Sequence, residues 1–478
     1  MMAALFSFDL PLARRPVASD KAYRPRAAAR AAGIPLNFVL IAGFLSWRAT
    51  SAVAGDDSQN SALPSVTEER FAIHGQFTYV EQGTDSFRAP YAGPNSLSPN
   101  QGRETTDLTL YGGARLWSGA EIWINPEIDQ GFGLDDTLGV AGFPSGEAYK
   151  VGKNQPYLRL PRLFVRETLD LDGDREAIEA GANQLAGFHS TNRWVFTVGK
   201  FSVADLFDAN QYAHDPRNDF LNWAAIDTGS FDYAADAWGY TVGAAAEWYQ
   251  GEWTARFGLF DLSNVPNSVH LEPGVHEFQI ELELEKRHEI FGHAGKVLIT
   301  AFDSRGRMGL LDEAVQIAQA TGNPVDIAAT RQLRDRVGAD LNLEQELAQD
   351  LGMFARIGKA AGNVETYEFT EIDRTLTAGL SLKGSRWGRT DDTVGLAGIV
   401  NHISAAREEF LNAGGLGVLI GDGQLPHPGP EQILETYYNL GLVPQAHLSL
   451  DYQFVKNPAY NRDRGPVSIF AVRFHAQF

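Results

Sequence analysis

The stretch from Trp194 to Tyr240 decides how this chain folds. It reads WVFTVGKFSVADLFDANQYAHDPRNDFLNWAAIDTGSFDYAADAWGY. Its first side chains alternate between two faces, as in a β-strand. About thirty residues rich in Asp, Asn, Tyr and Trp follow, from Ala204 to Trp238, and the alternation returns from Gly239 to Tyr249. A strand, a long polar and aromatic loop and a returning strand are typical of a membrane β-barrel whose loop folds over or into its pore.

The same two-residue alternation begins at Phe71 and recurs almost to the end of the chain. In the run FQIELELE at 278–285, the apolar and the acidic side chains fall on opposite faces. One such strand also fits a soluble sandwich, but charged side chains on one face of many strands favour a wall with lipid outside and water inside. About 16 such segments can be counted, and short connections alternate with long ones. We therefore predict an all-β fold, a transmembrane antiparallel barrel of about 16 strands with long external loops.

The composition agrees with a barrel. Hydrophobic residues make up 44% of the 478 residues, yet no run after the first 54 residues approaches the ~20 apolar residues of a membrane helix. Aromatic residues at 11% and 48 glycines fit many short, twisted strands with aromatic girdles. The chain has no cysteine, which excludes disulfides, thiolate metal sites and a cysteine nucleophile.

The beginning of the chain has the features of an export leader. Basic residues up to Arg30 precede an apolar core at Ile34–Trp47, and Ala52–Ala54 offers a small-residue cleavage site. The alternative, a membrane anchor, needs a longer core than these 14 residues. We expect three parts: a signal peptide (1–54), a polar lead-in (55–70) and the barrel domain (71–478).

The charge of the chain limits its partners. The expected leader holds seven basic and two acidic residues, so its removal takes the formal net charge from −20 to −25. Such acidity argues against nucleic acid or other anionic polymers as general partners.

The last strand, Val467–Phe478, carries the most specific local signal. Phe470, Phe474 and Phe478 share one face, opposite polar residues, and an ordinary edge strand would expose all three to water. A chain that ends in Phe after such a strand resembles the assembly signal of outer-membrane barrels. We expect this strand to meet the barrel-assembly machinery and to close the barrel by pairing with Phe71–Val80. The expected location is the outer membrane of a Gram-negative bacterium, in contact with lipid and lipopolysaccharide.

One segment departs from the alternation. Gly309–Arg336 carries apolar residues at helical spacing, and Thr321–Pro324 divides it into two short helices. Strand parity, counted back from the end of the chain, puts this helical insertion in an external loop. Two interpretations stay open: a lid over the pore mouth and a folded surface insertion.

No catalytic set stands out. The sequence has no G-x-S-x-G, no H-E-x-x-H and no P-loop, and Asp170–Asp174 has the wrong spacing for a calcium-binding EF-hand. Asn401, His402 and Ser404 suggest the triad of an outer-membrane phospholipase, but the adjacent residues 401 and 402 of one strand point to opposite faces. We predict no catalytic residue, no metal and no cofactor, and keep a barrel enzyme as the less favoured alternative.

Several blocks resemble one family. The segment TVGKFS…FDxNxYxHDPRxxFLNW at 197–223 is closely similar to a segment of the carbohydrate-selective outer-membrane porins of the glucose porin B type. Glu127–Gly133 and Asn183–Gly187 resemble the early part of that family, and several blocks within 435–466 resemble its closing strands. The resemblance covers roughly residues 71–478.

The resemblance implies a monomeric channel for facilitated, selective diffusion of mono- or oligosaccharides into the periplasm. A channel of this kind needs hydrogen-bonding groups for the hydroxyls of a sugar and aromatic surfaces for its ring faces. Because charged and aromatic residues at the constriction contact sugars in that family, the resemblance implies the following pore-lining positions: Trp123, Glu127, Asp129, Arg162, Arg166, Lys200, Asp208, Asn210, Tyr212, His214, Asp215, Arg217, Asn218 and Trp223.

A general or anion-preferring porin of the same fold is the alternative function. Arginines at 162 and 166 occur on the inner faces together with carboxylates at 127 and 129. In a strongly ion-selective pore, side chains of one sign of charge would predominate. Counted in order, Ala204–Trp238 is the third external loop, and we expect it to fold inward and narrow the channel.

Overall fold

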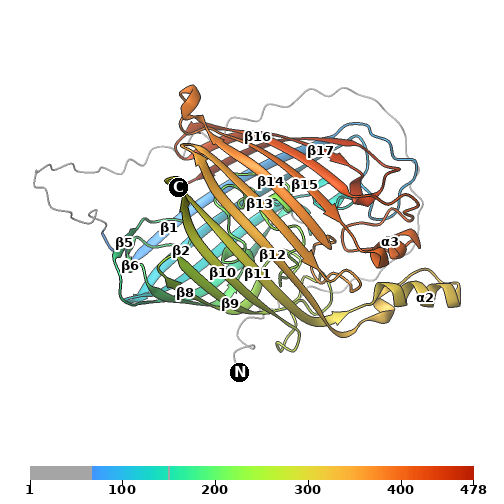
Figure 1. Ribbon diagram of the computed structural model, residues 1–478, viewed down its shortest axis with the longest axis horizontal. Coiled ribbons are helices and arrows are strands. Elements are labelled where there is room, and N and C mark those ends of the chain that lie inside the picture. The colour runs from blue at the N-terminus through green and yellow to red at the C-terminus, as the bar shows by residue number, and fades with distance from the viewer. Residues whose placement is uncertain (1–66, 149–150) are drawn as a thin grey trace, which may run out of the picture. The chain divides into compact units, whose positions relative to one another are not determined.

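The computed structural model describes residues 67–148 and 151–478. Within these residues, sixteen antiparallel strands form one closed barrel (Figure 1). This confirms the predicted fold class. The expected signal peptide and most of the lead-in lie outside the described residues, so both stay predictions.

The barrel strands follow one another around the wall in chain order. They are β1 (Phe71–Thr84), β2 (Gln101–Trp117), β3 (Ala120–Gly131), β4 (Lys153–Asp170), β7 (Arg193–Phe201), β8 (Thr241–Gln250), β9 (Trp253–Asp261), β10 (Phe278–Ile290), β11 (His293–Met308), β12 (Gln332–Ala348), β13 (Leu351–Ala360), β14 (Arg374–Lys383), β15 (Thr393–His402), β16 (Glu431–Val443), β17 (Ala446–Lys456) and β18 (Val467–Gln477).

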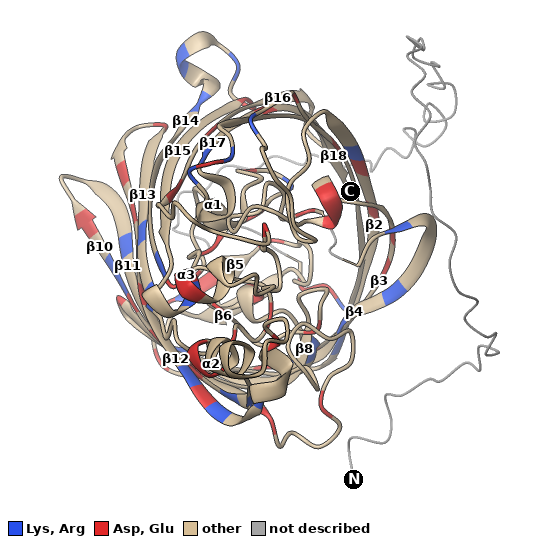
Figure 2. Ribbon diagram, turned by 90° about the vertical axis from the view of Figure 1, so that its right-hand side faces the viewer, with Lys and Arg blue, Asp and Glu red and all other residues tan. Residues whose placement is uncertain are grey.

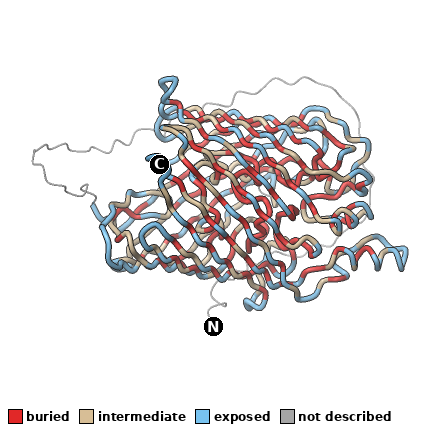
Figure 3. The backbone as a smooth tube through the Cα atoms, in the orientation of Figure 1, coloured by how far each residue is buried: buried red, intermediate tan, exposed pale blue. Residues whose placement is uncertain are grey.

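Each strand turns its apolar side chains outward and its polar ones inward. In β17, Leu450 is 59% exposed, whereas Asp451 next to it is 6% exposed. This pattern is the reverse of a soluble protein and fits a wall that meets hydrocarbon on its outer face. Figure 3 shows the resulting alternation of buried and exposed positions along the strands.

The connections differ at the two ends of the barrel. Turns such as Gly251–Glu252 join neighbouring strands at one end, which in outer-membrane barrels is the periplasmic end. Long loops join them at the other end. Two connections at the short-turn end are longer. Residues 384–392 include a 3₁₀ turn, Gly384–Trp387, and residues 171–192 contain a small separate hairpin, β5 (Arg175–Ile178) and β6 (Gly187–Ser190).

The predicted helical insertion lies in a long loop, as expected, but is shorter than predicted. Helix α2 spans Leu311–Thr321, and a single 3₁₀ turn at Ile327–Thr330 follows. The helical prediction for 332–336 is wrong, because β12 begins at Gln332 and turns Leu333 outward and Arg336 inward. Helix α2 packs against α3 (Ala405–Asn412), another long-loop helix at the same end of the barrel (Figure 1).

In the described residues, no helix is both long enough and apolar enough to cross a bilayer.

The barrel closes where β1 meets β18, as the sequence predicted. The pairing runs from Gln76 opposite Gln477 to Thr84 opposite Ile469. Phe478 extends it, because its backbone and that of Gly75 exchange two hydrogen bonds of 3.0 Å. The ring of Phe478 occupies the space where a side chain at position 75 would stand, so a glycine and a terminal aromatic residue fit each other at the seam.

We expect Phe478→Asp to lower the amount of folded barrel in the outer membrane, because a charge replaces the ring at the closing seam. The measurement is heat-modifiable migration of the membrane-inserted protein. Phe291→Asp is a matched control, since Phe291 is 97% exposed in the β10–β11 turn, away from the seam. Equal amounts of both variants in the membrane would contradict the role of the terminal residue.

Candidate functional site

The third long loop, residues 202–240 between β7 and β8, lies inside the barrel. We call it the inward loop. Figure 2 looks along the barrel from the long-loop end and shows α1 (Trp223–Ile226), the short helix of this loop, within the ring of strands. Phe207, Phe220, Leu221 and Phe231 of the loop are fully buried. The prediction that this stretch folds inward is therefore confirmed.

Charged groups of the wall hold the inward loop. Buried Arg356 on β13 donates hydrogen bonds to the carbonyls of Ala225 (2.7 Å) and Ala213 (2.8 Å) and pairs with Asp208 (3.4 Å). On β16, the Glu435 carboxylate accepts hydrogen bonds from the backbone N–H groups of Leu221 and the next residue. These contacts satisfy loop backbone groups that would otherwise be buried without partners.

A core of aromatic rings fills the space between the inward loop and its neighbours. Trp223 stacks on Phe143 of the second long loop, with ring centroids 5.2 Å apart. It also meets Phe369 of the β13–β14 loop edge-on at 5.1 Å. The second and third long loops are joined further by a hydrogen bond from the backbone N–H of Trp223 to the backbone carbonyl of Phe143. Packed side chains thus fill part of the barrel interior.

A cavity of about 460 Å³ lies within the lumen. Most of its lining comes from the second and third long loops and the 171–192 connection. Strands β1, β2, β4 and β18 and the β13–β14 and β15–β16 loops contribute the rest. Its volume lies within the ~300–1,000 Å³ of typical small-molecule sites. We call it the central cavity. Its aromatic lining residues are Tyr111, Phe143, Trp223, Tyr233, Trp238, Tyr240 and Phe369.

Cations in the central cavity stand beside carboxylates. Arg162 donates two hydrogen bonds to Asp205, of 2.7 and 2.6 Å, and its guanidinium lies over the Tyr240 ring. Arg217 lies 3.3 Å from the carboxylate of Glu147 and close to that of Asp107. A third pair joins His214 to Asp227. The lining therefore offers many donors and acceptors while each positive charge has a negative neighbour.

The His214 imidazole is held in its charged form. Burial by itself would lower its pKa, but the Asp227 carboxylate at 3.3 Å outweighs that effect and raises the pKa to about 9. The second ring nitrogen lies 3.0 Å from the carbonyl of Ala204, which accepts a hydrogen bond from the imidazolium. This histidine thus ties two parts of the inward loop together.

A model of the carbohydrate-selective porin family, OprB, matches residues 95–478. The chain belongs to this family. Its members are porins, and the barrel of this chain is accordingly an outer-membrane channel that crosses the bilayer with its strands.

The chain is similar to several solved structures, and the first of these shows the same fold. Pseudomonas putida OprB at high pH is 14% identical to the chain, with a TM-score of 0.64 over 86% of this chain and 94% of that one. Its low-pH structure is 10% identical, with a TM-score of 0.47 and coverages of 86% and 93%. The Acinetobacter baumannii channel DcaP is 10% identical, with a TM-score of 0.47 and coverages of 85% and 97%. No curated protein sequence matches the chain.

In this OprB-family channel, some of the predicted pore-lining residues meet at the central cavity and others do not. Five of the fourteen line it: Arg162, His214, Asp215, Arg217 and Trp223. All but Arg162 come from the inward loop, and whether these residues contact a solute stays a prediction.

The remaining predicted residues lie outside the central cavity, and most of them are held by contacts within the protein. On β3, Trp123 is fully buried over Gly113. Asp208 and Asn210 hold the inward loop to Asn342 on β12. Glu127 and Asp129 pair with Arg159, and Lys200 pairs with Asp236. Arg166 binds the carbonyl of Asn183. Tyr212 and Asn218 line a separate cavity of about 440 Å³.

Sequence reasoning missed most partners of the five lining residues. Asp205, Glu147 and Asp227, which neutralise the cations, are separated from them by varied distances along the chain. Arg159 was not predicted to face the lumen, for a different reason. A register irregularity between β3 and β4 places Arg159 opposite Glu127 and Arg162 opposite Asn125, so both arginines turn inward although their separation of three residues predicts opposite faces.

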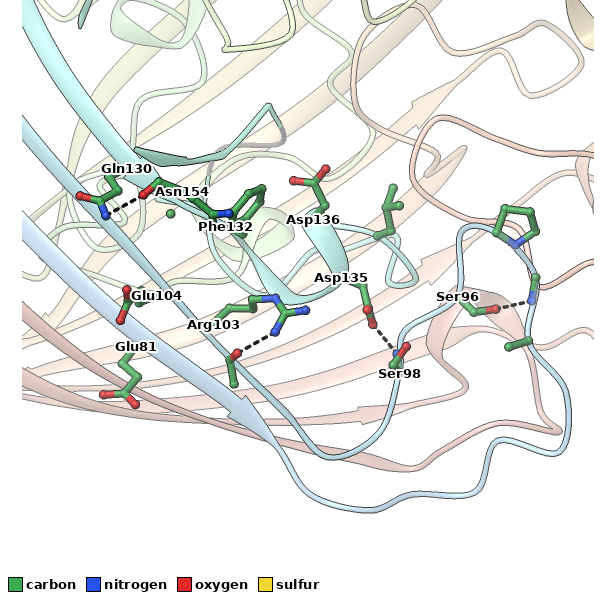
Figure 4. A pocket seen from close by; sticks show the side chains of 16 residues that line it. Glu81, Ser96, Ser98, Arg103, Glu104, Gln130, Phe132, Asp135, Asp136 and Asn154 are labelled. Atoms are coloured by element: carbon green, nitrogen blue, oxygen red, sulfur yellow. Dashed lines mark hydrogen bonds between the residues drawn. The ribbon is translucent and has the colours of Figure 1, made fainter. Parts of the chain in front are cut away.

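A larger recess, of about 840 Å³, lies outside the lumen (Figure 4). Its rim includes Glu81 and Glu104, which are paired across β1 and β2 and exposed on the outer face of the wall. The Asp135 carboxylate at its inner side accepts hydrogen bonds from the backbone N–H of Ser98 and from the Gln101 side chain. A solute in this recess would be beside the channel, not within it.

We expect Arg356→Met to loosen the inward loop, because Asp208 is then left buried without its cation. Such a loss costs about 3–5 kcal/mol, and the single-channel conductance should become larger and noisier. The double variant Arg356→Met/Asp208→Asn should recover part of the thermal stability. Arg305→Met is the control, since its pair with Asp335 is about half exposed on the outer wall. A conductance trace like that of the wild type would contradict the anchoring role.

The His214 pair gives a pH prediction. The folded pKa lies above the ordinary ~6.5 of histidine, so the pair stabilises the loop fully below that value and the contribution is lost as the pH rises through about 9. Conductance fluctuations should increase with a midpoint near that pH. His214→Gln should abolish the transition, whereas His276→Gln, on an exposed loop, should keep it. A transition that survives in His214→Gln belongs to another group.

Proposed function

We propose that this channel selects sugars, and that it carries mono- or oligosaccharides from outside into the periplasm by facilitated diffusion. The observation that carries the proposal is the lining of the central cavity, where aromatic rings and paired charges face one space of about 460 Å³. The family to which the chain belongs agrees with this chemistry.

The aromatic part of the lining suits the ring of a sugar. Phe143, Trp223 and Phe369 pack on one another as a rigid group at the side of the cavity. A pyranose presents C–H groups on its ring faces, and these can lie against an aromatic surface with little loss of hydration. Because Phe143 and Phe369 hold the Trp223 ring between them, the position of the group is fixed before a solute arrives.

The polar part suits the hydroxyl groups. Each hydroxyl needs a donor and an acceptor to replace its water, and the Arg162–Asp205 and Arg217–Glu147 pairs supply both within one side of the cavity. Their partners neutralise the arginines, so a neutral solute meets hydrogen-bonding groups without a strong net field. Weak, multiple contacts of this kind permit release as well as entry.

A general or anion-preferring porin is the competing function. An anion preference needs arginines whose charge is free to act on a passing ion. In the central cavity the guanidinium groups of Arg162 and Arg217 stand beside carboxylates. This pairing favours selection by hydrogen bonding over selection by charge.

The proposed channel works as a single chain in lipid. The sixteen strands close on themselves without a second copy, which supports the proposed monomer. The exposed apolar outer wall supports contact with outer-membrane lipid and lipopolysaccharide. The seam at Phe478 supports recognition of that strand by the barrel-assembly machinery. The buried Asn401 and the outward His402 face opposite sides of the wall, which supports a channel over a phospholipase.

We expect Arg217→Ala to weaken the blockade of ion current by sugar, because a charged donor is lost from the cavity. The loss should be about 1–3 kcal/mol, toward the lower value in a hydrated pore. The variant should also become more cation-preferring, since Glu147 and Asp107 lose their positive neighbour. The measurement is conductance of the purified protein in planar bilayers, titrated with mono- and disaccharides.

The control for this experiment is Arg305→Ala, whose side chain lies on the outer wall. Blockade equal to the wild type in Arg217→Ala, or an absence of sugar blockade in the wild type itself, would favour the general porin.

A further inference from the structure

The connection between β4 and β7 is too long for a periplasmic turn and lies across the barrel end. Figure 1 places β5 and β6 at the end of the barrel that carries the short turns. In Figure 2, seen from the opposite end, the same two strands fall within the ring of barrel strands. We call residues 171–192 the periplasmic hairpin. Its tip, residues 179–186, reaches into the lumen and contributes Ala182 and Asn183 to the central cavity.

The tip of the periplasmic hairpin is fixed to the wall. Asn183 accepts a hydrogen bond of 2.9 Å from the Asn125 side chain on β3, and its carbonyl accepts one of 2.9 Å from Arg166 on β4. Next to it, Leu185 is buried at 1% exposure. These contacts hold the tip in one position inside the lumen.

The base of the tip is fixed as well. The backbone of Ala186 exchanges hydrogen bonds with Glu69, its N–H to the Glu69 side chain and its carbonyl from the Glu69 N–H. Arg115 on β2 donates to the carbonyls of both residues. The periplasmic hairpin is therefore joined to the chain that enters β1, on the side of the barrel where the sheet closes.

Three neutral amide side chains line the central cavity at its periplasmic end. Gln76 on β1 and Gln477 on β18 are directly opposite each other at the closing seam, and both line the central cavity together with Asn183. Strand β18 ends at Gln477, at the end of the barrel that carries the short turns, so this is the periplasmic end of the cavity. The Arg166 guanidinium lies beside Asn183 and binds its carbonyl, whereas the paired charges of the cavity belong to the inward loop, the second loop and β4.

We propose that the periplasmic hairpin forms a second constriction of the channel, at which Asn183, Gln76 and Gln477 make an amide subsite for neutral, hydroxyl-rich solutes. An amide donates through its NH₂ and accepts through its oxygen, so three amides offer both kinds of partner to the hydroxyls of a departing solute. The class of solute rests on the proposed function, whereas the constriction itself does not.

Ion conductance tests the constriction without any sugar. In 1 M KCl the Debye length is about 3 Å, so only a charge on the conducting path alters the current. Asn183→Asp should make the channel more cation-preferring. Glu176→Gln changes the charge by the same amount on the exposed arm of the same hairpin, outside its tip, and should behave as the wild type. Asn183→Gly removes the side chain yet tolerates the backbone angle φ of 56° at this position, and it should raise the conductance.

Replacing Asp174–Ser190 by Gly-Ser is the larger variant. The strand ends remain paired through the hydrogen bond from Leu171 N–H to the Asn192 carbonyl, so a short turn can join them. This variant should conduct more than the wild type and pass disaccharides faster relative to monosaccharides in liposome swelling. Heat-modifiable migration checks that the barrel of this variant is folded. If it does not fold, the conductance of the two Asn183 variants tests the constriction.

Two results would overturn the proposal. Wild-type conductance and selectivity in Asn183→Asp, Asn183→Gly and the hairpin replacement would place the hairpin clear of the path. A larger conductance in the replacement alone would move the constriction away from Asn183. A wild-type channel that admits no sugar would refute the proposed function. The ion-conductance measurements would still test the second constriction, because they involve no sugar.

Discussion

Closure of the sheet between β1 and β18 is the contact on which the rest of the structure depends. A strand edge left open in hydrocarbon would expose unpaired backbone groups, so a membrane sheet is stable only when its first and last strands meet. Here the seam extends to the final residue, where Phe478 pairs with Gly75 and its ring covers that glycine. Once closed, the wall separates an apolar exterior from an interior in which charged side chains can be placed.

The interior is then built by segments that enter from both ends. The inward loop arrives from the long-loop end and is held by wall charges such as Arg356 and Glu435. The periplasmic hairpin arrives from the other end and is held by Asn125 and Arg166. The space left between them is the central cavity, so the width of the lumen at this level is set by loops rather than by the barrel wall.

Pairing of charges connects stability with selectivity in this lumen. A guanidinium buried without a carboxylate would destabilise the folded state, and a free guanidinium on the path would act on every passing ion. Pairs such as Arg162–Asp205 avoid both effects and still present donors and acceptors. The same arrangement that keeps the loops in place therefore suits recognition of neutral solutes by hydrogen bonding.

The fold can be predicted from the residue pattern, because two-residue alternation indicates which face of each strand meets lipid, and the aromatic last strand indicates where the barrel closes. The pattern also indicates that the stretch around Trp223 enters the lumen. Which inward residues reach the cavity depends on the packing of the folded chain, because alternation gives the face of a side chain but not what covers it, as for the buried Trp123. A register irregularity turned Arg159 inward against the alternation, and Asn183 joined the cavity through a hairpin folded back from the periplasmic end. Such placements depend on contacts between segments far apart in the chain, which no local pattern encodes.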